Sequence, residues 1–258
     1  MHAAHRVLDP AHEKQIPPGL CALAVMTKAP RPGKVKTRLT PPLSPEEAAA
    51  LNICFLRDTT AAISVTAANG RARGIAVYTP VGEEAAYENI LSREFKLVSQ
   101  RGDAFGERLI FAAADLFALG FESVCLIDSD SPTVPQSAYQ QAVELLARPG
   151  DRVVLGPSDD GGYYLIGLKK VHRALFENID WSTERVCEQT AERARELALE
   201  LHLLPTWYDV DDRATLRRLC AELLNGTTTP AGFSAPETRG FLQGVIAREG
   251  RARIWPNE

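Results

Sequence analysis

Short apolar runs alternate along this chain with segments of helical pattern, and this alternation limits the folds open to it. Early runs are CALAVMT (residues 21–27), GIAVYTP (74–80), FKLVSQ (95–100) and ESVCLID (122–128). Strands that are apolar throughout are typical of a sheet covered on both faces, because a half-exposed strand would alternate polar and apolar residues. We therefore predict an α/β fold with three α/β/α layers around a mostly parallel, mixed sheet.

The chain divides into a short polar start and one domain. Residues 1–19 are polar and end in IPPG, so we expect a tail outside the fold, followed by a single domain over residues 20–258. The helix after the first strand should begin at Ser44 as N-cap. Pro45 then takes the first helical position, and Glu47 completes a capping box.

Composition excludes several classes of protein. The formal net charge is -4 and the sequence pI is about 5.8, which argues against a nucleic-acid binder or a membrane-surface binder. No apolar run approaches membrane-spanning length. Five widely spaced cysteines form no C-x-x-C pair, so we expect reduced core thiols and a cytoplasmic protein rather than a zinc or dithiol site. They are Cys21, Cys54, Cys125, Cys187 and Cys220.

Positive charge is nevertheless concentrated directly after the first predicted strand. The stretch MTKAPRPGKVKTRLTP carries five cations: Lys28, Arg31, Lys34, Lys36 and Arg38. Gly33 allows a ligand to approach the backbone closely, and lysine and arginine on such a loop suit a polyphosphate. The G-x-x-x-x-G-K-[ST] pattern of a P-loop is missing. A solvated, charged surface loop is the alternative.

Acidic residues follow a later strand. Asp128 and Asp130, in LIDSDSP, are two residues apart and project to the same side of an extended chain, so both could meet one cation. Oxygen ligands favour Mg²⁺ or Mn²⁺. A helix N-cap or Asx-turn before Pro132 is the alternative, and it applies better to Ser131 than to the aspartates.

Two further acidic pairs lie at predicted strand ends. Asp159 and Asp160 precede two glycines in GPSDDGGYYLIGL, where a tight hairpin would explain the same residues. Asp209 and Asp211 repeat the two-residue spacing, although Asp211 could equally cap the next helix. Ligands of open parallel sheets bind beyond the carboxyl ends of the strands. A basic loop facing acidic pairs there suits a metal-bridged polyphosphate.

Six ordered motifs resemble the bacterial family of domain of unknown function 2064. They are KAPRPGKVKTRL, QRGDAFGERL, DSDSP, GPSDDGGYYLIGL, WSTERV and DVDD. The resemblance implies the Rossmann-like glycosyltransferase-A fold of nucleotide-diphospho-sugar transferases, in a family whose members are often described as glycosyltransferases encoded near radical-SAM enzymes. The first segment is also similar to the start of 2-phospho-L-lactate guanylyltransferase, which shares the fold.

The resemblance implies roles for residues on the donor side. Lys34, Lys36 and Arg38 would face the donor phosphates; the pattern of the basic loop itself adds Lys28 and Gly33 to the expected phosphate-binding residues. Asp130 would be the metal-site aspartate. Glycine is common in the family where this chain has Asp128, so Asp130 is the firmer ligand, and Asp211 matches a late aspartate near the metal. A segment bordering the nucleotide is matched by Gln100, Gly102, Gly106 and Arg108.

The resemblance also implies an acceptor side. Asp160, Gly161 and Gly162 match a D-G-G turn there, beside Asp159. Trp181 either lines the acceptor pocket or packs as a half-buried tryptophan.

Three functions are compatible with these residues. The first is a metal-dependent transferase that moves a sugar from a nucleotide sugar to a small-molecule acceptor, with Mg²⁺ or Mn²⁺ on Asp130, help from Lys36 and Arg38, and Asp160 as base. The second is a nucleotidyltransferase that joins an NTP to a phosphorylated small molecule and releases pyrophosphate. The third is a non-catalytic nucleotide-binding protein.

Overall fold

A single seven-stranded sheet organises the chain. The computed structural model describes residues 5–12, 16–225 and 232–254, and its strand order is β3-β2-β1-β4-β6-β5-β7. Only β6 runs antiparallel to its neighbours, so the predicted mostly parallel, mixed sheet is confirmed. The strands are β1 (Cys21–Lys28), β2 (Ala72–Thr79), β3 (Lys96–Ser99), β4 (Ser123–Ile127), β5 (Arg152–Pro157), β6 (Tyr163–Leu168) and β7 (Glu200–Leu203).

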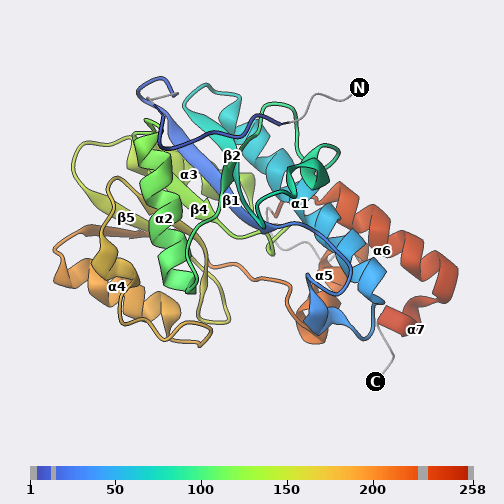
Figure 1. Ribbon diagram of the computed structural model, residues 1–258. Helices are drawn as coiled ribbons and strands as arrows, with labels where there is room; N and C mark the ends of the chain where they lie inside the picture. Colours follow the sequence, from blue (N-terminus) through green and yellow to red (C-terminus); the bar gives the residue numbers. More distant parts are fainter. Residues whose placement is uncertain (1–4, 13–15, 226–231, 255–258) are drawn as a thin grey trace.

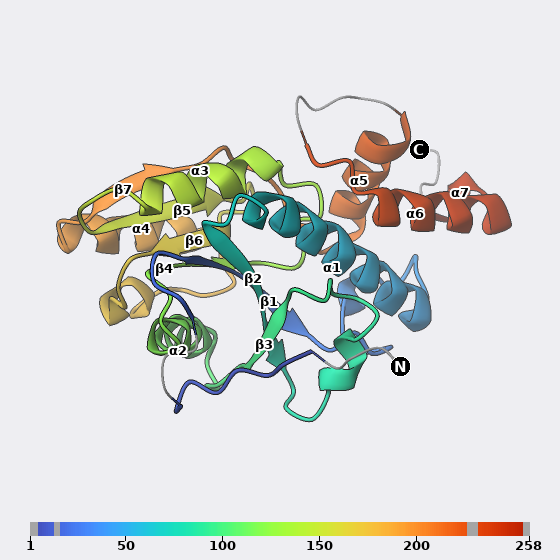
Figure 2. The ribbon, with the colours of Figure 1, turned by 90° about the horizontal axis from the view of Figure 1, so that it is seen from above.

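Helices cover both faces of the sheet (Figures 1 and 2). On one face lie α1 (Pro45–Ala67) and α3 (Gln136–Leu146), and on the other lie α2 (Phe105–Ala118) and α4 (Val186–Glu196). The strand β1 contributes to the hydrophobic core on each face of the sheet. Leu23 and Val25 belong to the core on the side of α1 and α3, and Ala22 and Ala24 belong to the core on the side of α2 and α4. The remaining elements are α5 (Arg213–Asn225), α6 (Pro236–Glu249), α7 (Arg251–Ile254) and the 3-10 turns η1 (Thr37–Leu39), η2 (Glu84–Tyr87) and η3 (Arg173–Phe176).

The start of α1 has the predicted capping box. The Ser44 hydroxyl accepts from the Glu47 amide at 3.2 Å, and the Ser44 amide donates to the Glu47 carboxylate at 2.9 Å. Arg253 of α7 donates to both oxygens of that carboxylate, at 3.0 and 2.6 Å. The C-terminal helices are therefore fastened to the helix that follows the basic loop.

The N-terminal segment differs from the expected tail. The Leu8 amide donates to the Leu97 carbonyl at 2.8 Å, and the Leu97 amide donates to the Arg6 carbonyl at 3.0 Å. Leu8 and Ile16 are buried against the α2 face. The reason is that β3 is an edge strand with unpaired backbone groups, which this segment satisfies. Residues 1–4 and 13–15 lie outside the described part of the chain.

The five cysteine thiols are free, and all but the partly exposed Cys187 are buried, as expected for core thiols. Within the described residues, the helices are too short or too polar to cross a membrane.

A buried carboxylate joins α6 to α1, and it gives a first testable prediction. Asp58 of α1 accepts from the backbone amides of Glu237 and Thr238, at 3.1 and 2.8 Å. Asp58→Asn would turn an amide N–H toward one of these donors, so the free energy of unfolding should fall by about 1–3 kcal/mol. Urea denaturation measures it. The control is Asp103→Asn on the surface, and an equal effect of both changes would contradict this role.

Candidate functional site

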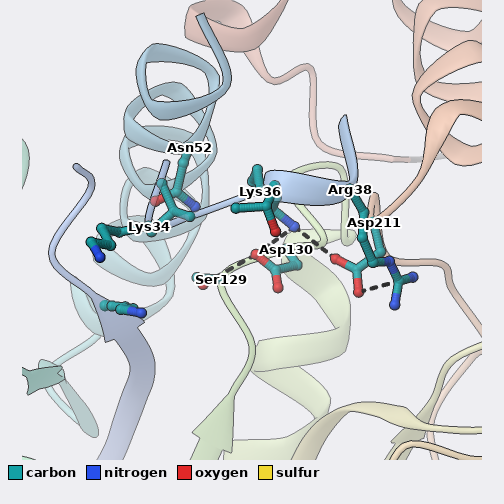
Figure 3. A pocket seen from close by; sticks show the side chains of 10 residues that line it. Lys34, Lys36, Arg38, Asn52, Ser129, Asp130 and Asp211 are labelled. Atoms are coloured by element: carbon teal, nitrogen blue, oxygen red, sulfur yellow. Dashed lines mark hydrogen bonds and ion pairs between the residues drawn. The ribbon is translucent and has the colours of Figure 1, made fainter. Parts of the chain in front are cut away.

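The loop after β1 places Lys36 at the centre of the candidate site. Lys36 has a left-handed backbone conformation, with φ of 48°. Its side chain is only 5% exposed, and its Nζ lies 2.7 Å from Asp130 Oδ1 and 2.9 Å from Asp211 Oδ1. Figure 3 shows both carboxylates beside Lys36, and the ammonium also donates to the Val210 carbonyl at 2.8 Å. An ammonium has three N–H donors, so these contacts use all of them.

This placement changes the expected role of Lys36. Burial alone would lower the pKa of the ammonium, but attraction to Asp130 and Asp211 outweighs burial and raises the pKa above its usual value. The side chain is therefore a charged link between two carboxylates. The resemblance implied that Lys36 faces donor phosphates; its ammonium contacts the two aspartates, and the residue also lines the cavity beside them.

Other cations of the loop line a cavity of about 260 Å³ beside this link. Arg38 is well exposed and lies 3.6 Å from Asp211 Oδ2. Lys28 and Lys34 also border the cavity, as do Asn52 of α1 and Ser129. Arg31 points elsewhere and pairs with Glu83. Gly33 has a positive φ of 70° and turns the loop without lining the cavity. With Lys36, which also lines it, four predicted phosphate-binding cations thus share one cavity.

A second cavity of about 500 Å³ adjoins the first, and Arg38, Asp130 and Asp211 line both. One wall is aromatic, where Phe105 and Trp181 pack edge to face with ring centres 5.0 Å apart. The other walls are strongly acidic. Their carboxylates belong to Asp128, Asp130, Asp160, Glu184, Asp209 and Asp211.

Two chain segments bring these acids together. Asp128 and Asp130 follow β4, as predicted, and the segment 207–211 crosses the neighbouring strand ends. The Val210 amide donates to the Asp130 carbonyl at 2.9 Å, and the Ser158 hydroxyl donates to Asp209 Oδ1 at 3.2 Å. The N-terminus of α5 is capped by Asp212, which accepts from the Thr215 amide. Asp211 is therefore left to face the cavities.

Two of the crowded carboxyl groups, those of Asp128 and Asp209, have raised pKa values. Burial raises the pKa of Asp128 well above its usual range, and the neighbouring Asp130 raises it further. Burial, with Asp160 and Asp211 nearby, raises the pKa of Asp209 to about 6. Both shifts mean that negative charge in this cavity is not fully compensated, so a proton or a bound cation is favoured there.

The D-G-G turn contributes one acid to the larger cavity. Asp160 lines it and accepts from the Gly162 amide at 2.8 Å. Gly161 has a φ of 91°, and a Cβ at this position would lie 2.0 Å from the Glu184 carbonyl oxygen, so only glycine fits. Asp159 points away and pairs with Arg218.

Within the segment expected to border the nucleotide, Phe105 lines the larger cavity, whereas the four predicted residues line neither cavity. These four are Gln100, Gly102, Gly106 and Arg108. A Cβ on Gly106 would lie 2.9 Å from Trp181 Nε1, so this glycine allows the helix to pack under the tryptophan. Trp181 therefore packs against Gly106 of α2 and also lines the larger cavity.

Several lining residues carry no separate signal in the sequence. Ser182, Thr183 and Glu184 belong to WSTERV, of which the resemblance singled out only the tryptophan. Asn52 lies within a segment of helical pattern, and the signal available there was a single polar residue on the apolar face of the helix.

The aspartates offer oxygen ligands of the kind that Mg²⁺ and Mn²⁺ prefer. Lys36 and the Ser129 hydroxyl contact Oδ1 of Asp130, which leaves Oδ2 on this carboxylate. Among the described residues, no three His, Cys, Asp or Glu side chains form a ready-made metal site. The residues fit a hydrated Mg²⁺ or Mn²⁺ held by one or two carboxylates and by phosphate oxygens of a ligand.

The mixed sheet, with its helices on both faces and its cavities at the strand ends, has the fold of the nucleotide-diphospho-sugar transferases. A protein from Desulfovibrio desulfuricans G20, provisionally assigned as a nucleotide-diphospho-sugar transferase, is 30% identical over 90% of this chain and 98% of its own, with a TM-score of 0.76. The sequence profile of uncharacterized proteins conserved in bacteria, DUF2064, matches residues 62–183. The chain belongs to this family, and the predicted resemblance is confirmed.

More distant structures share the fold alone. CMP:2-keto-3-deoxy-manno-octonic acid synthetase complexed with CTP is 10% identical, with a TM-score of 0.52 over 80% of this chain and 99% of that one. A cytidylyltransferase from Leptospira borgpetersenii serovar Hardjo-bovis is 11% identical, with a TM-score of 0.50 over 96% and 98%. No curated protein matches the sequence.

Removal of the Lys36 ammonium should cost stability. Lys36→Met keeps the apolar stem but leaves two facing carboxylates without their shared cation, so the free energy of unfolding should fall by about 2 kcal/mol in urea denaturation. The control, Lys34→Met in the same loop, removes an exposed charge and should change the free energy by less than about 0.5 kcal/mol. Equal effects of the two changes would refute the linking role.

The raised pKa of Asp209 predicts a pH dependence. The carboxyl binds its proton more tightly in the folded protein, so its ionisation destabilises the fold as pH rises from about 4 to about 6. Asp209→Asn should therefore raise the free energy of unfolding at pH 7.5, by on the order of 1–3 kcal/mol, and change it little at pH 3.5. Denaturation curves of both proteins across this range measure the difference. A difference that does not vary with pH would contradict the assignment.

Proposed function

We propose that this protein is a metal-dependent transferase that moves a sugar from a nucleotide sugar to a small-molecule acceptor. One observation carries the proposal: a cationic cavity and a larger acidic cavity adjoin at the carboxyl ends of the strands and share Arg38, Asp130 and Asp211. Open α/β sheets bind ligands at this end. The donor diphosphate would lie against Lys34 and Arg38, with the transferred sugar directed into the larger cavity.

Residues of this chain would divide the work of the transfer. Asp130 would hold Mg²⁺ or Mn²⁺ with Asp128 or Asp211, and the ion, when bound, would neutralise the charge of the diphosphate. Arg38 would stabilise the departing nucleoside diphosphate. Asp160 is exposed to the larger cavity and would take the proton from the acceptor hydroxyl or thiol as it attacks the sugar. Phe105 and Trp181 supply an apolar surface for a sugar ring or acceptor.

Nucleotidyl transfer is the second candidate. Four cations line the smaller cavity, although Lys36 among them is already paired with two aspartates, and such a set suits a triphosphate, which supports this reaction. The acidic larger cavity supports sugar transfer instead, because a phosphorylated acceptor would enter a space with six carboxyl side chains and Arg38 as its lining cation. Like charges at such short range repel strongly in a partly desolvated site. We therefore place sugar transfer first.

The phosphate role of the loop gives a direct test. Lys34→Ala with Arg38→Ala should weaken the binding of nucleoside diphosphates and nucleotide sugars by at least tenfold, because two charge-assisted contacts are lost. The fold should be unaffected, since exposed charges contribute little to stability. Isothermal titration calorimetry with and without Mn²⁺ measures both the affinity and its metal dependence. Arg31→Ala, which removes a cation outside the cavity, is the control.

The products separate the two candidate reactions. Release of a nucleoside diphosphate from a nucleotide sugar supports sugar transfer if EDTA or Asp160→Asn abolishes that release. Pyrophosphate released from an NTP, with nucleotide sugars inert, supports nucleotidyl transfer. Unchanged nucleotide affinity in the double variant would show that the loop does not bind phosphates.

A further inference from the structure

Asn52 is a buried polar residue in an otherwise apolar part of α1. Its neighbours on the covered face, Leu51, Phe55 and Leu56, belong to the core, whereas the Asn52 amide is only 4% exposed and its Oδ1 has no hydrogen-bond partner. Asparagine is a poor helix former, and a buried unpaired amide oxygen destabilises a fold. Leucine would suit this position better, so the fold itself does not explain the amide.

The surroundings of Asn52 point to a ligand. The residue lines the 260 Å³ cavity with Lys28, Lys34 and Arg38, and Figure 3 shows it projecting from α1 toward the basic loop. The cations can only donate hydrogen bonds, whereas the amide carries both an acceptor and donors, and rotation about χ2 exchanges its two ends. An ionised phosphate offers acceptors alone, so phosphate by itself would leave the amide oxygen unpaired. A ligand that satisfies the whole cavity must carry a donor group next to its phosphates.

We propose that Asn52 is a specificity residue that hydrogen-bonds a sugar hydroxyl of a nucleotide whose phosphates bind Lys34 and Arg38. A hydroxyl both donates and accepts, which matches the amide, and a sugar is bonded directly to the phosphates, whereas the base lies beyond the ribose. The hydroxyl belongs either to the ribose or to the transferred sugar. The inference rests on the nucleotide binding of the proposed function.

The test compares ligands that differ in their hydroxyls. Asn52→Leu removes the amide at similar volume, and its affinities for pyrophosphate, the four common ribonucleoside diphosphates and their nucleotide sugars are measured by isothermal titration calorimetry. Binding of a nucleotide ligand should weaken at least tenfold, whereas pyrophosphate, which has no sugar, should bind as before. The free energy of unfolding should be unchanged or higher. By contrast, Lys34→Ala with Arg38→Ala should weaken pyrophosphate as well.

Deoxy ligands identify which sugar is bound. If the hydroxyl is on the ribose, the unaltered protein should prefer the ribonucleotide to its 2′-deoxy or 3′-deoxy form about tenfold, and Asn52→Leu should abolish that preference. If it is on the transferred sugar, Asn52→Leu should weaken the nucleotide sugar but not the diphosphate. The matched control is Thr59→Val, a change at another buried α1 residue with an unpartnered hydroxyl that does not line the cavity; nucleotide affinity should not change.

The outcomes separate this inference from the proposed function. If the unaltered protein binds no nucleotide, both are wrong. If the unaltered protein binds nucleotides and Asn52→Leu binds every ligand as tightly as the unaltered protein does, only the proposed role of Asn52 is wrong. Equal weakening of pyrophosphate and nucleotides in Asn52→Leu, or a loss of folding stability, would also overturn that role, because the amide would then be supporting the cavity and not reading a hydroxyl.

Discussion

The contact of the Lys36 ammonium with two carboxylates holds the candidate site together. It joins the loop after β1, the end of β4 and the segment before α5, which lie up to 175 residues apart in the chain. A cation that is 5% exposed destabilises a fold unless it is paired, and here three acceptors surround it. Asp130 and Asp211 line both cavities, so the shape of both depends on this contact.

The same contact separates charge on either side of it. Lys28 and Lys34 line the smaller cavity and not the larger one, whereas Asp128 and Asp209, whose pKa values are raised, line the larger cavity and not the smaller one. One ammonium satisfies one oxygen from each of two aspartates and does not neutralise the acids beyond them. This arrangement suits a ligand that brings anionic groups to one side and neutral or cationic groups to the other, and the nucleotide sugar, metal ion and neutral acceptor of the proposed function would have that charge pattern.

The features that could be predicted from sequence are local ones. Apolar strands and the Ser44 capping box depend on residues that are neighbours in the sequence. The acids of DSDSP directly follow β4, whose place in the sheet is fixed by its parallel pairing with β1. Pairing of residues 6–8 with β3 could not be predicted, because it depends on a distant strand being left at the edge. The charge of Lys36 was visible in the sequence, but its partners were not: the segment 207–211 brings Asp211 to it only through tertiary packing.

Because the two cavities share walls, binding in one changes the electrostatics of the other. Arg38 lies 3.6 Å from Asp211 and offsets the negative charge of that carboxylate. A diphosphate bound to Arg38 would neutralise the arginine's positive charge and remove this offset. The aspartates would then attract a cation more strongly, so donor phosphates and metal ion should bind together more tightly than either does alone. Reciprocity requires the metal to strengthen phosphate binding by the same factor. Under the proposed function, the bound cation would also make the cavity less repulsive to the electron pair with which a neutral acceptor attacks the sugar.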